Sequence, residues 1–188
     1  TSAVVRPPIG ETHLLKQFLD IGCQNFVVPM VESGAQAAEM VRATRYPPAG
    51  VRGVGASTAR ASGFNAYADY LHTANDQICV FVQVESRAGL VALPDILVVG
   101  GVDGVFIGPS DLSADLGYLG NPNAPEVVAA IDGALDAIAA SGKASGIFAV
   151  DPADAERYLA RGVSFVAVAS DINSMATALR QTASRFRQ

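Results

Sequence analysis

The segment FVQVE, residues 81–85, closes an apolar run with an amide and a carboxylate two positions apart. The run predicts a buried strand, and side chains alternate between the two faces of a strand. Phe81, Gln83 and Glu85 are therefore expected on one face. A buried carboxylate without a partner is costly because it loses its hydration. Glu85 therefore needs a partner, and a bound cation would serve.

A second carboxylate stands in GVDGVFIGPSDLSADLG, residues 101–117. Gly-Pro ends a predicted strand at 104–108 and leaves Ser110 and Asp111 at the rim. Alone, Asp111 could be the N-cap of a short helix LSADL, and Glu85 could be a structural carboxylate paired with an arginine. Together, carboxylates at the ends of successive strands offer hard oxygen ligands to Mg²⁺, Mn²⁺ or Co²⁺. Neither motif contains the His or Cys that would favour zinc.

The elements that must position these groups alternate along the chain. Apolar runs predict strands at 3–7, 25–31, 78–85, 104–108, 145–150 and 165–169. Helical patterns follow near 11–21, 34–44, 87–97, 124–140, 152–161 and 172–187. Glycines follow several predicted helix ends, as C-caps do, at Gly22, Gly101, Gly142 and Gly162. Six βα units without a linker indicate a single parallel α/β domain over residues 1–188.

The distribution of polar residues selects among parallel folds. No dinucleotide or Walker motif stands at a strand–helix junction. Polar residues instead collect at predicted strand ends, namely Arg6, Gln83 with Glu85, Asp111, and Ser170 with Asp171. (β/α)8 barrels build their sites in this way. Since only six of eight βα units are present, we expect roughly 60–70 further residues before residue 1, or another chain that fills the gap.

The long connection at 45–76 stands out, because loops of this length without structure are uncommon and are usually functional or partly helical. AYADYLHTAND predicts a helix within it. GVRGVG, which contains Arg52, Gly53 and Gly55, has two interpretations. It could wrap an anion in backbone N–H groups, or it could be a glycine-rich turn that packs at a subunit contact.

Composition excludes several classes of function. The net charge is −5, the pI is about 4.9, and there is no basic run, which disfavours nucleic acid as a partner. No apolar stretch reaches the length of about 18 residues that predicts a membrane span, and the start does not resemble a signal peptide. Cys23 and Cys79 are expected to be buried free thiols. These features suit a cytoplasmic protein.

Four stretches resemble the HpcH/HpaI family of class II, metal- and pyruvate-dependent aldolases, namely RYPPAGVRGVG, VQVESRAGL, GVDGVFIGPSDLSADLG and SGKASGIF. The family includes 4-hydroxy-2-oxoheptane-1,7-dioate and 2-dehydro-3-deoxyglucarate aldolases, and the resemblance runs from Arg6 to the C-terminus. It implies a (β/α)8 TIM barrel of the phosphoenolpyruvate/pyruvate type. It also implies reversible cleavage of a 4-hydroxy-2-oxo acid to pyruvate and an aldehyde.

The resemblance also implies roles for individual residues. Arg6 would be the essential arginine beside the substrate carbonyl, and Phe148 would lie near the aldehyde. The metal ligands would be Glu85 and Asp111, and the pyruvate contacts would be Gln83 and the backbone around Ser110. The cation would stabilise the enolate by its charge, and Arg6 would add a fixed positive charge where the oxyanion develops.

One part of the family pattern is not matched. Its His-Asp pair for proton transfer, in a DGEHA-like segment, has no counterpart here, and His13 and His72 are expected to be ordinary surface or packing residues. We therefore expect weak or no aldolase activity from the 188-residue chain alone. A Schiff-base mechanism is disfavoured, because Lys16 and Lys143, the two lysines, are not at strand carboxyl ends.

Other functions stay open at this stage. A lyase or decarboxylase acting on oxaloacetate or an acyl-CoA thioester could use the same metal site, although no basic patch favours CoA. A flavin or phosphate-sugar barrel is disfavoured, because GIFAVDP and VASDIN lack Gly-rich turns. A non-catalytic metabolite-binding or assembly subunit is a third alternative.

The last predicted helix bears on assembly. In SMATALRQTASRFRQ, an apolar stripe is formed by Met175, Leu179 and Phe186, a pattern that suits packing on an apolar surface. The family resemblance implies that this helix, about 172–187, is exchanged between subunits of a homo-oligomer, which would be a hexamer.

Overall fold

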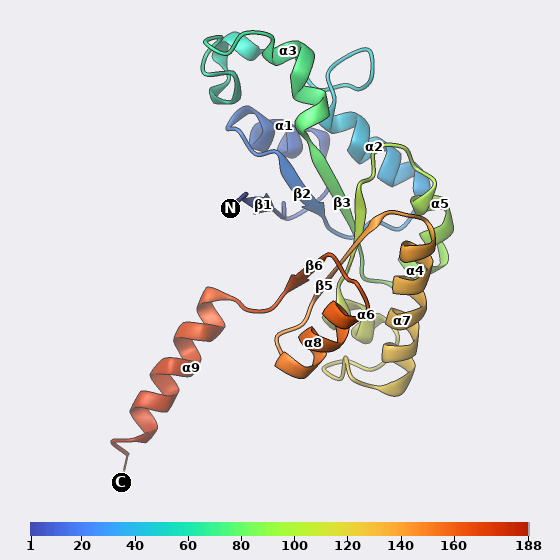
Figure 1. Ribbon diagram of the computed structural model, residues 1–188, viewed down its shortest axis with the longest axis vertical. Coiled ribbons are helices and arrows are strands. Elements are labelled where there is room, and N and C mark those ends of the chain that lie inside the picture. The colour runs from blue at the N-terminus through green and yellow to red at the C-terminus, as the bar shows by residue number, and fades with distance from the viewer. Residues whose placement is uncertain (188) are drawn as a thin grey trace.

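The structure, a computed structural model, describes residues 1–187. Six parallel strands form one curled sheet in the order of the chain (Figure 1). The strands are β1 (Val4–Val5), β2 (Asn25–Val28), β3 (Cys79–Val84), β4 (Gly104–Ile107), β5 (Ala144–Phe148) and β6 (Phe165–Ala167). This arrangement confirms the predicted parallel α/β fold and places β1 and β6 at opposite edges of the sheet.

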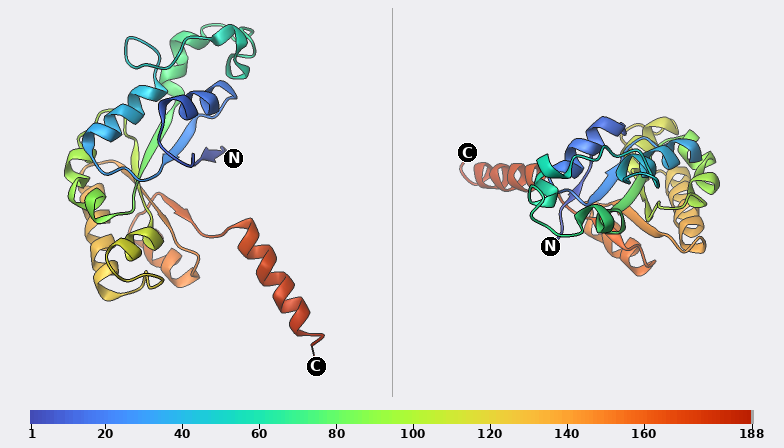
Figure 2. Two further views of the ribbon diagram at one scale, coloured as in Figure 1. Left: turned by 180° about the vertical axis from the view of Figure 1, so that it is seen from behind. Right: turned by 90° about the horizontal axis from the view of Figure 1, so that it is seen from above.

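Helices cover the outer side of the sheet. The helices in the described residues are α1 (Thr12–Asp20), α2 (Gly34–Thr44), α3 (Tyr70–Thr73), α4 (Arg87–Val91), α5 (Leu93–Leu97), α6 (Pro109–Asp115), α7 (Pro125–Ala140), α8 (Pro152–Ala160) and α9 (Asp171–Ser184). Figure 1 shows α2, α5, α4 and α7 in a row along this side, and Figure 2 shows the same row from behind. In both, α9 projects away from the rest of the chain.

The core lies between the sheet and these helices, because alternate strand residues point outward. Val80, Val82 and Val84 of β3 are fully buried there, together with Leu15 of α1 and Ile131 of α7. Residues of the opposite parity point to the inner side, as predicted for Phe81, Gln83 and Glu85.

Aromatic rings fill the inner side below the strand ends. The Phe165 ring packs edge-to-face on the rings of Phe81 and Phe106, with centroids 6.1 and 5.4 Å away. Two strand glycines make room for these rings. A Cβ on Gly104 would come within 2.4 Å of Phe81, and one on Gly146 within 2.5 Å of Phe106.

Several predicted boundaries are wrong for local reasons. The strand expected at 3–7 stops at Val5, because the following RPP segment contains two prolines that cannot donate to a ladder. The helix expected over 87–97 is split into α4 and α5, because Pro94 has no N–H for the bond that a continuous helix needs. The helix expected in AYADYLHTAND is only α3 followed by the 3-10 turn Ala74–Gln77.

Three of the four predicted glycine caps are confirmed. Gly22, Gly142 and Gly162 directly follow the C-caps of α1, α7 and α8, with φ of 106°, 77° and 84°. Gly101 also has a positive φ, of 87°, but the prediction that it caps a helix is wrong, because α5 ends earlier with its C-cap at Val98. Within residues 1–187, every helix is too short or too polar to cross a lipid bilayer.

Candidate active site

A cavity of about 360 Å³ opens on the inner side of the sheet at the carboxyl ends of the strands. Its wall brings together five of the six predicted site residues, namely Arg6, Gln83, Ser110, Asp111 and Phe148. The sixth, Glu85, is 2% exposed and is bonded directly to Gln83. Ser170 and Asp171, also predicted at a strand end, are not in this wall, and Ser170 instead caps α9.

The structure answers which protein groups hold Glu85. Its Oε1 accepts a hydrogen bond of 2.9 Å from the backbone N–H of Met30, and its Oε2 accepts one from Gln83 Nε2. Gln83 Oε1 in turn accepts from Arg6 Nε at 3.2 Å. In residues 1–187, Glu85 is therefore not paired directly with an arginine. Arg6 is linked to the Glu85 carboxylate through hydrogen bonds of the Gln83 amide.

The surroundings of Glu85 disfavour its charged form. Burial raises the pKa of the Glu85 carboxyl above its usual range, and Asp111 raises it further through its charge and hydrogen bonding. The Met30 N–H and the Arg6 charge act in the opposite direction. Two neighbouring carboxyl groups of this kind gain most from a bound cation, which would neutralise both.

Asp111 reaches this place from the first turn of α6, which begins directly after β4. The predicted N-cap role for Asp111 is wrong, because Gly108 occupies that position. No group of three or more His, Cys, Asp or Glu side chains gathers in the part of the chain that the structure describes. The two carboxylates of Glu85 and Asp111 are a donor set that suits Mg²⁺-like ions, which take one or two carboxylates and complete their shell with water and substrate oxygens.

Gly108 is a site residue that sequence reasoning missed. A Cβ at this position would lie 2.6 Å from Glu85 Oε2 and 2.8 Å from Gln83 Nε2. The strand must therefore lack a side chain here for Gln83 and Glu85 to keep their bond. The signal available in the sequence was a glycine directly before Pro109 at the end of the strand next to β3.

We expect Gly108→Ala to lose cation affinity and to destabilise the fold by about 1–3 kcal/mol, the usual cost of overpacking. The extra methyl group must displace the Glu85 carboxylate or the Gln83 amide. Gly133→Ala is the matched control, because a Cβ there meets nothing within 4 Å. Since Gly133 lies inside α7, that change should stabilise by about 0.5–1 kcal/mol. Denaturant unfolding measures both, and equal effects of the two substitutions would contradict the steric argument.

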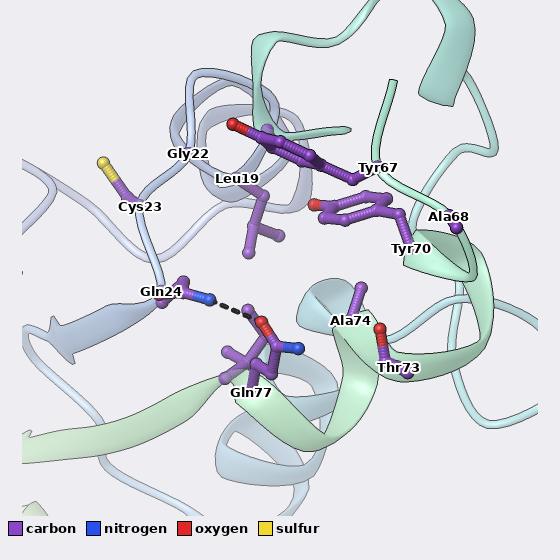
Figure 3. A pocket seen from close by; sticks show the side chains of 12 residues that line it. Leu19, Gly22, Cys23, Gln24, Tyr67, Ala68, Tyr70, Thr73, Ala74 and Gln77 are labelled. Carbon is purple, nitrogen blue, oxygen red and sulfur yellow. Dashed lines mark hydrogen bonds between the residues drawn. The ribbon is translucent and has the colours of Figure 1, made fainter. Parts of the chain in front are cut away.

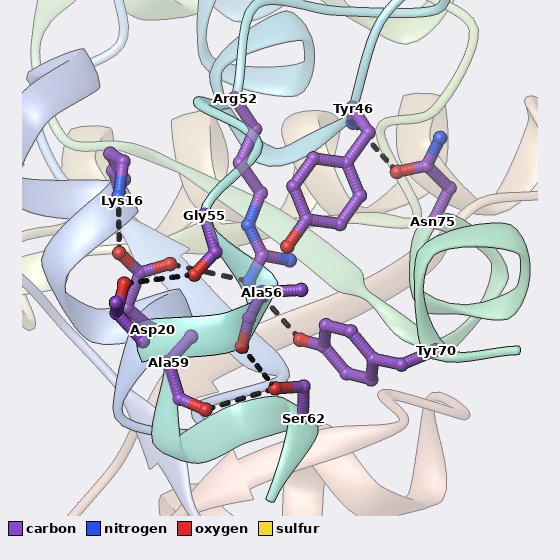
Figure 4. Close-up of polar contacts among 11 residues, drawn as sticks. Lys16, Asp20, Tyr46, Arg52, Gly55, Ala56, Ala59, Ser62, Tyr70 and Asn75 are labelled. Atoms are coloured by element: carbon purple, nitrogen blue, oxygen red, sulfur yellow. Dashed lines mark hydrogen bonds and ion pairs between the residues drawn. The ribbon is translucent and has the colours of Figure 1, made fainter. Parts of the chain in front are cut away.

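The first backbone N–H groups of the GVRGVG motif are bonded within the protein rather than pointing at an anion. The backbone N–H groups of Val51 and Arg52 donate to Arg42 O and Arg45 O at 2.9 Å each. Arg52 itself is 1% exposed, and its guanidinium lies 4.3 Å from the centroid of the Tyr46 ring (Figure 4).

Arg52 instead ties the long connection to the body of the protein. Its Nη2 donates to Tyr70 Oη at 3.1 Å and lies 3.5 Å from Asp20 Oδ1 of α1. Cation–π contact offsets part of the burial cost of such a charge. Of the two interpretations of the motif, the structure supports a turn that packs within the chain.

A second cavity, of about 350 Å³, lies at the opposite end of β2 and β3 (Figure 3). Tyr67, Tyr70 and Cys23 are in its wall, and Gln24 Nε2 donates to Gln77 Oε1 there at 2.9 Å. Its wall contains no carboxylate or basic side chain. Burial raises the pKa of the Cys23 thiol, which makes it a poor nucleophile. This cavity therefore offers fewer groups for acid–base or metal chemistry than the cavity beside Glu85.

The remaining predicted groups behave largely as expected. Cys23 and Cys79 are free and half-buried, rather than fully buried. His13 and His72 are exposed. Lys143 precedes β5 and donates to the carbonyls of Val99 and Val102.

Comparisons with known proteins show the family of the chain. Residues 1–178 match the model of the family described as HpcH/HpaI aldolase/citrate lyase. The chain is 56% identical over 184 residues to the hydroxypyruvate/pyruvate aldolase of Deinococcus radiodurans, which covers 98% of this chain and 66% of that protein. It is 55% identical over 183 residues to the 4-hydroxy-2-oxo-heptane-1,7-dioate aldolase of Escherichia coli, with 97% and 70% covered.

A solved structure shows the same arrangement of the chain. A HpcH/HpaI aldolase/citrate lyase family protein from Burkholderia cenocepacia superposes with a TM-score of 0.93 at 41% identity, over 98% of this chain and 73% of that one. The chain spans about two thirds of the length of the curated relatives it matches. With its Glu85–Gln83–Arg6 chain and Asp111 at the carboxyl ends of parallel strands, this protein belongs to the HpcH/HpaI aldolase/citrate lyase family.

Proposed function

We propose that this protein is a class II pyruvate aldolase, a metal-dependent carbon–carbon lyase. It would cleave a 4-hydroxy-2-oxo acid reversibly to pyruvate and an aldehyde. The observation that carries the proposal is the hydrogen-bonded chain from Arg6 through Gln83 to Glu85, with Asp111 alongside. The names of the two curated relatives support the same reaction class.

The residues of the cavity have distinct proposed roles. Glu85 and Asp111 would hold a divalent cation, Mg²⁺, Mn²⁺ or Co²⁺, which when bound supplies Lewis-acid stabilisation of negative charge. Arg6 places a fixed positive charge where the 2-oxo oxygen of the substrate gains charge during cleavage. The Gln83 amide fixes Arg6 relative to Glu85, and the backbone around Ser110 would bind the pyruvate carboxylate. His13 and His72 are not proposed as the base, since neither is in the cavity wall.

The aldehyde would lie against the apolar part of the wall. Phe148 is 38% exposed beside the cavity, and Phe106 and Phe165 line the same space. These rings exclude water from one side of the substrate, which strengthens the electrostatic interactions that Arg6 makes.

We also propose that the six strands are part of a (β/α)8 TIM barrel, in a single partial-barrel domain over residues 1–188. β1 and β6 each pair with one neighbour only in the described chain. A closed barrel needs its last strand to pair with its first. The weak or absent activity expected of this chain alone stays a prediction.

The test is pyruvate release from a set of 4-hydroxy-2-oxo acids after chelation and after return of Mg²⁺, Mn²⁺ or Co²⁺. Release that depends on the cation is expected from a chain in which the site is complete. Loss of CO₂ from oxaloacetate, with no retro-aldol product from any of the acids, would favour the decarboxylase alternative. Full turnover in the presence of chelator would contradict a metal site at Glu85 and Asp111.

We further propose that α9 mediates a homo-oligomer, with a hexamer as the expected size. None of its residues is buried, and Ile172, Met175 and Leu179 are 69%, 62% and 61% exposed. Large apolar side chains in such a row are typical of a surface that packs against a partner. Phe186, just beyond α9, is 82% exposed and extends the apolar stripe.

Sedimentation velocity at micromolar concentration is expected to show the oligomer, and Leu179→Glu is expected to dissociate it, because a charge would be buried in the contact. Gln181→Glu, at an exposed position of the same helix, controls for the added negative charge. A wild-type monomer under these conditions would contradict the assembly.

The free thiols of Cys23 and Cys79 support a reducing compartment, and we propose the cytoplasm.

A further inference from the structure

The turn between β2 and α2, residues 29–36, lies against the end of β3 that carries Glu85. It makes contact at three successive points. Met30 N–H donates to Glu85 Oε1 at 2.9 Å, Val31 N–H donates to Gln83 O at 3.1 Å, and Ser86 Oγ donates to Glu32 Oε1 at 2.6 Å. The position of Glu85 therefore depends on the shape of this turn as well as on its own strand.

Met30 adopts an unusual backbone conformation in the turn. Its φ is 55°, in the left-handed region that residues other than glycine rarely occupy. Such conformations persist only where surrounding contacts hold them, and they cluster at functional sites. Some neighbouring contact must therefore hold Met30 with its N–H toward Glu85.

The Gln36 side chain holds the turn from both sides. Its Nε2 donates to Met30 O at 3.2 Å, and its Oε1 accepts from the backbone N–H of Glu32 at 2.9 Å. No hydrogen bond joins Gln36 itself to Glu85 or Gln83 in residues 1–187. Gln36 therefore acts on the site through the turn residues that it bonds, Met30 and Glu32.

The two ends of the Gln36 amide have separable roles. Ser33 is the N-cap of α2, and the Gln36 N–H donates to Ser33 Oγ at 3.1 Å. Ser33 and Gln36 therefore have the spacing of a capping box, in which the side chain of the third helical residue reaches back to N–H groups before the helix. The acceptor Oε1 completes this cap by binding the Glu32 N–H. The donor Nε2 binds the Met30 carbonyl and thereby holds the left-handed turn.

We infer that Gln36 is a positioning residue for the cation site: it holds Met30 so that the Met30 N–H fixes the Glu85 carboxylate beside Asp111. The inference rests on the proposed function. It extends the site from the strand ends to the first turn of α2, where no residue touches the reacting atoms.

Binding of Mn²⁺ alone, measured by electron paramagnetic resonance of free Mn²⁺ without substrate, tests this directly. Gln36→Glu keeps an acceptor for Glu32 N–H but cannot donate to Met30 O. We expect it to bind Mn²⁺ about 10-fold more weakly, at the lower end of the range for outer-shell partners of metal ligands, with little change in unfolding temperature. The added negative charge would by itself strengthen cation binding, so a weaker affinity reports the lost hydrogen bond.

Gln36→Met removes both ends of the amide. It should weaken Mn²⁺ binding to a similar degree and also lower the unfolding temperature, because the cap is lost. Gln77→Met is the matched control: it deletes the amide bonded to Gln24 at the other end of the sheet and should leave Mn²⁺ affinity unchanged.

The possible outcomes distinguish a failure of the inference about Gln36 from a failure of the proposed function. Wild-type Mn²⁺ affinity in Gln36→Glu, or an equal loss in Gln77→Met, would overturn the role of Gln36 while leaving the cation site in place. A wild-type protein that binds no Mn²⁺ would overturn both.

Discussion

In a protein whose site is complete, Glu85→Gln is expected to reduce cation-dependent aldol cleavage by about 10³-fold or more, the rate equivalent of the several kcal/mol that a metal supplies to charge stabilisation. The glutamine keeps the size of the side chain and one acceptor for the Met30 N–H or the Gln83 amide. It removes the charge that would hold the cation. Asp111→Asn should give a loss of similar size, because the two carboxylates serve one ion.

The fold should survive both changes. Glu85 is a buried carboxylate whose pKa burial raises, so its ionised form costs stability in the metal-free protein above the usual Glu pKa of about 4.3. Replacing it with a neutral amide removes that cost. Circular dichroism of the metal-free variant should therefore match the wild type.

Asp115→Asn is the matched control on the same helix. Asp115 lies one turn after Asp111 in α6, and its Oδ2 accepts from the Arg87 backbone N–H. This substitution should leave Mn²⁺ binding and turnover within a few fold of the wild type. Binding titrations and pyruvate assays measure the whole series, and undiminished turnover in Glu85→Gln would refute the metal site.

Arg6→Lys is expected to lower kcat by about 10²–10³-fold, the usual cost of removing one donor to a developing oxyanion. Lysine keeps the charge but lacks the planar fork with which arginine can donate from Nε to Gln83 Oε1 and still present N–H groups to a substrate. Mn²⁺ affinity should change little, since Arg6 is not a proposed ligand. This split between turnover and metal binding separates Arg6 from Glu85.

Arg60→Lys controls for the exchange itself. Arg60 is exposed in a 3-10 turn of the long connection, away from the cavity wall, and its replacement should leave kcat unchanged. Steady-state kinetics at saturating cation compare the two variants. Equal kcat in Arg6→Lys and wild type would show that the arginine binds Gln83 without taking part in the reaction.

Local sequence patterns were sufficient for the architecture and for the centre of the site. Apolar runs and helical periods alternate six times, and the glycines directly after α1, α7 and α8 adopt the positive φ that their positions predict. The meeting of Glu85 and Asp111 follows from the same logic, because the carboxyl ends of neighbouring parallel strands lie at one edge of a sheet. Strand alternation then places Gln83 and Glu85 on the same inner face.

Exact boundaries were less predictable, because single residues override a periodic pattern. Pro94 divides one apolar helical stretch into α4 and α5, and the RPP segment shortens β1. These breakers were visible in the sequence. Whether such a residue ends an element depends on whether a hydrogen bond needs its backbone N–H. This can be decided only when the register of the element is known.

The contacts that hold the site were decided by tertiary structure alone. Met30 and Glu85 are 55 positions apart, and Arg6 and Gln83 are 77 apart. No periodicity links such pairs. The Tyr46 and Tyr70 rings around Arg52 have the same origin. The Gln36 contacts are different, because Gln36 bonds Met30 and Glu32 only six and four positions away, as its capping-box spacing allows. A buried polar group must find a partner wherever the packed chain brings one, so the identity of that partner is fixed only once the strands and helices have assembled.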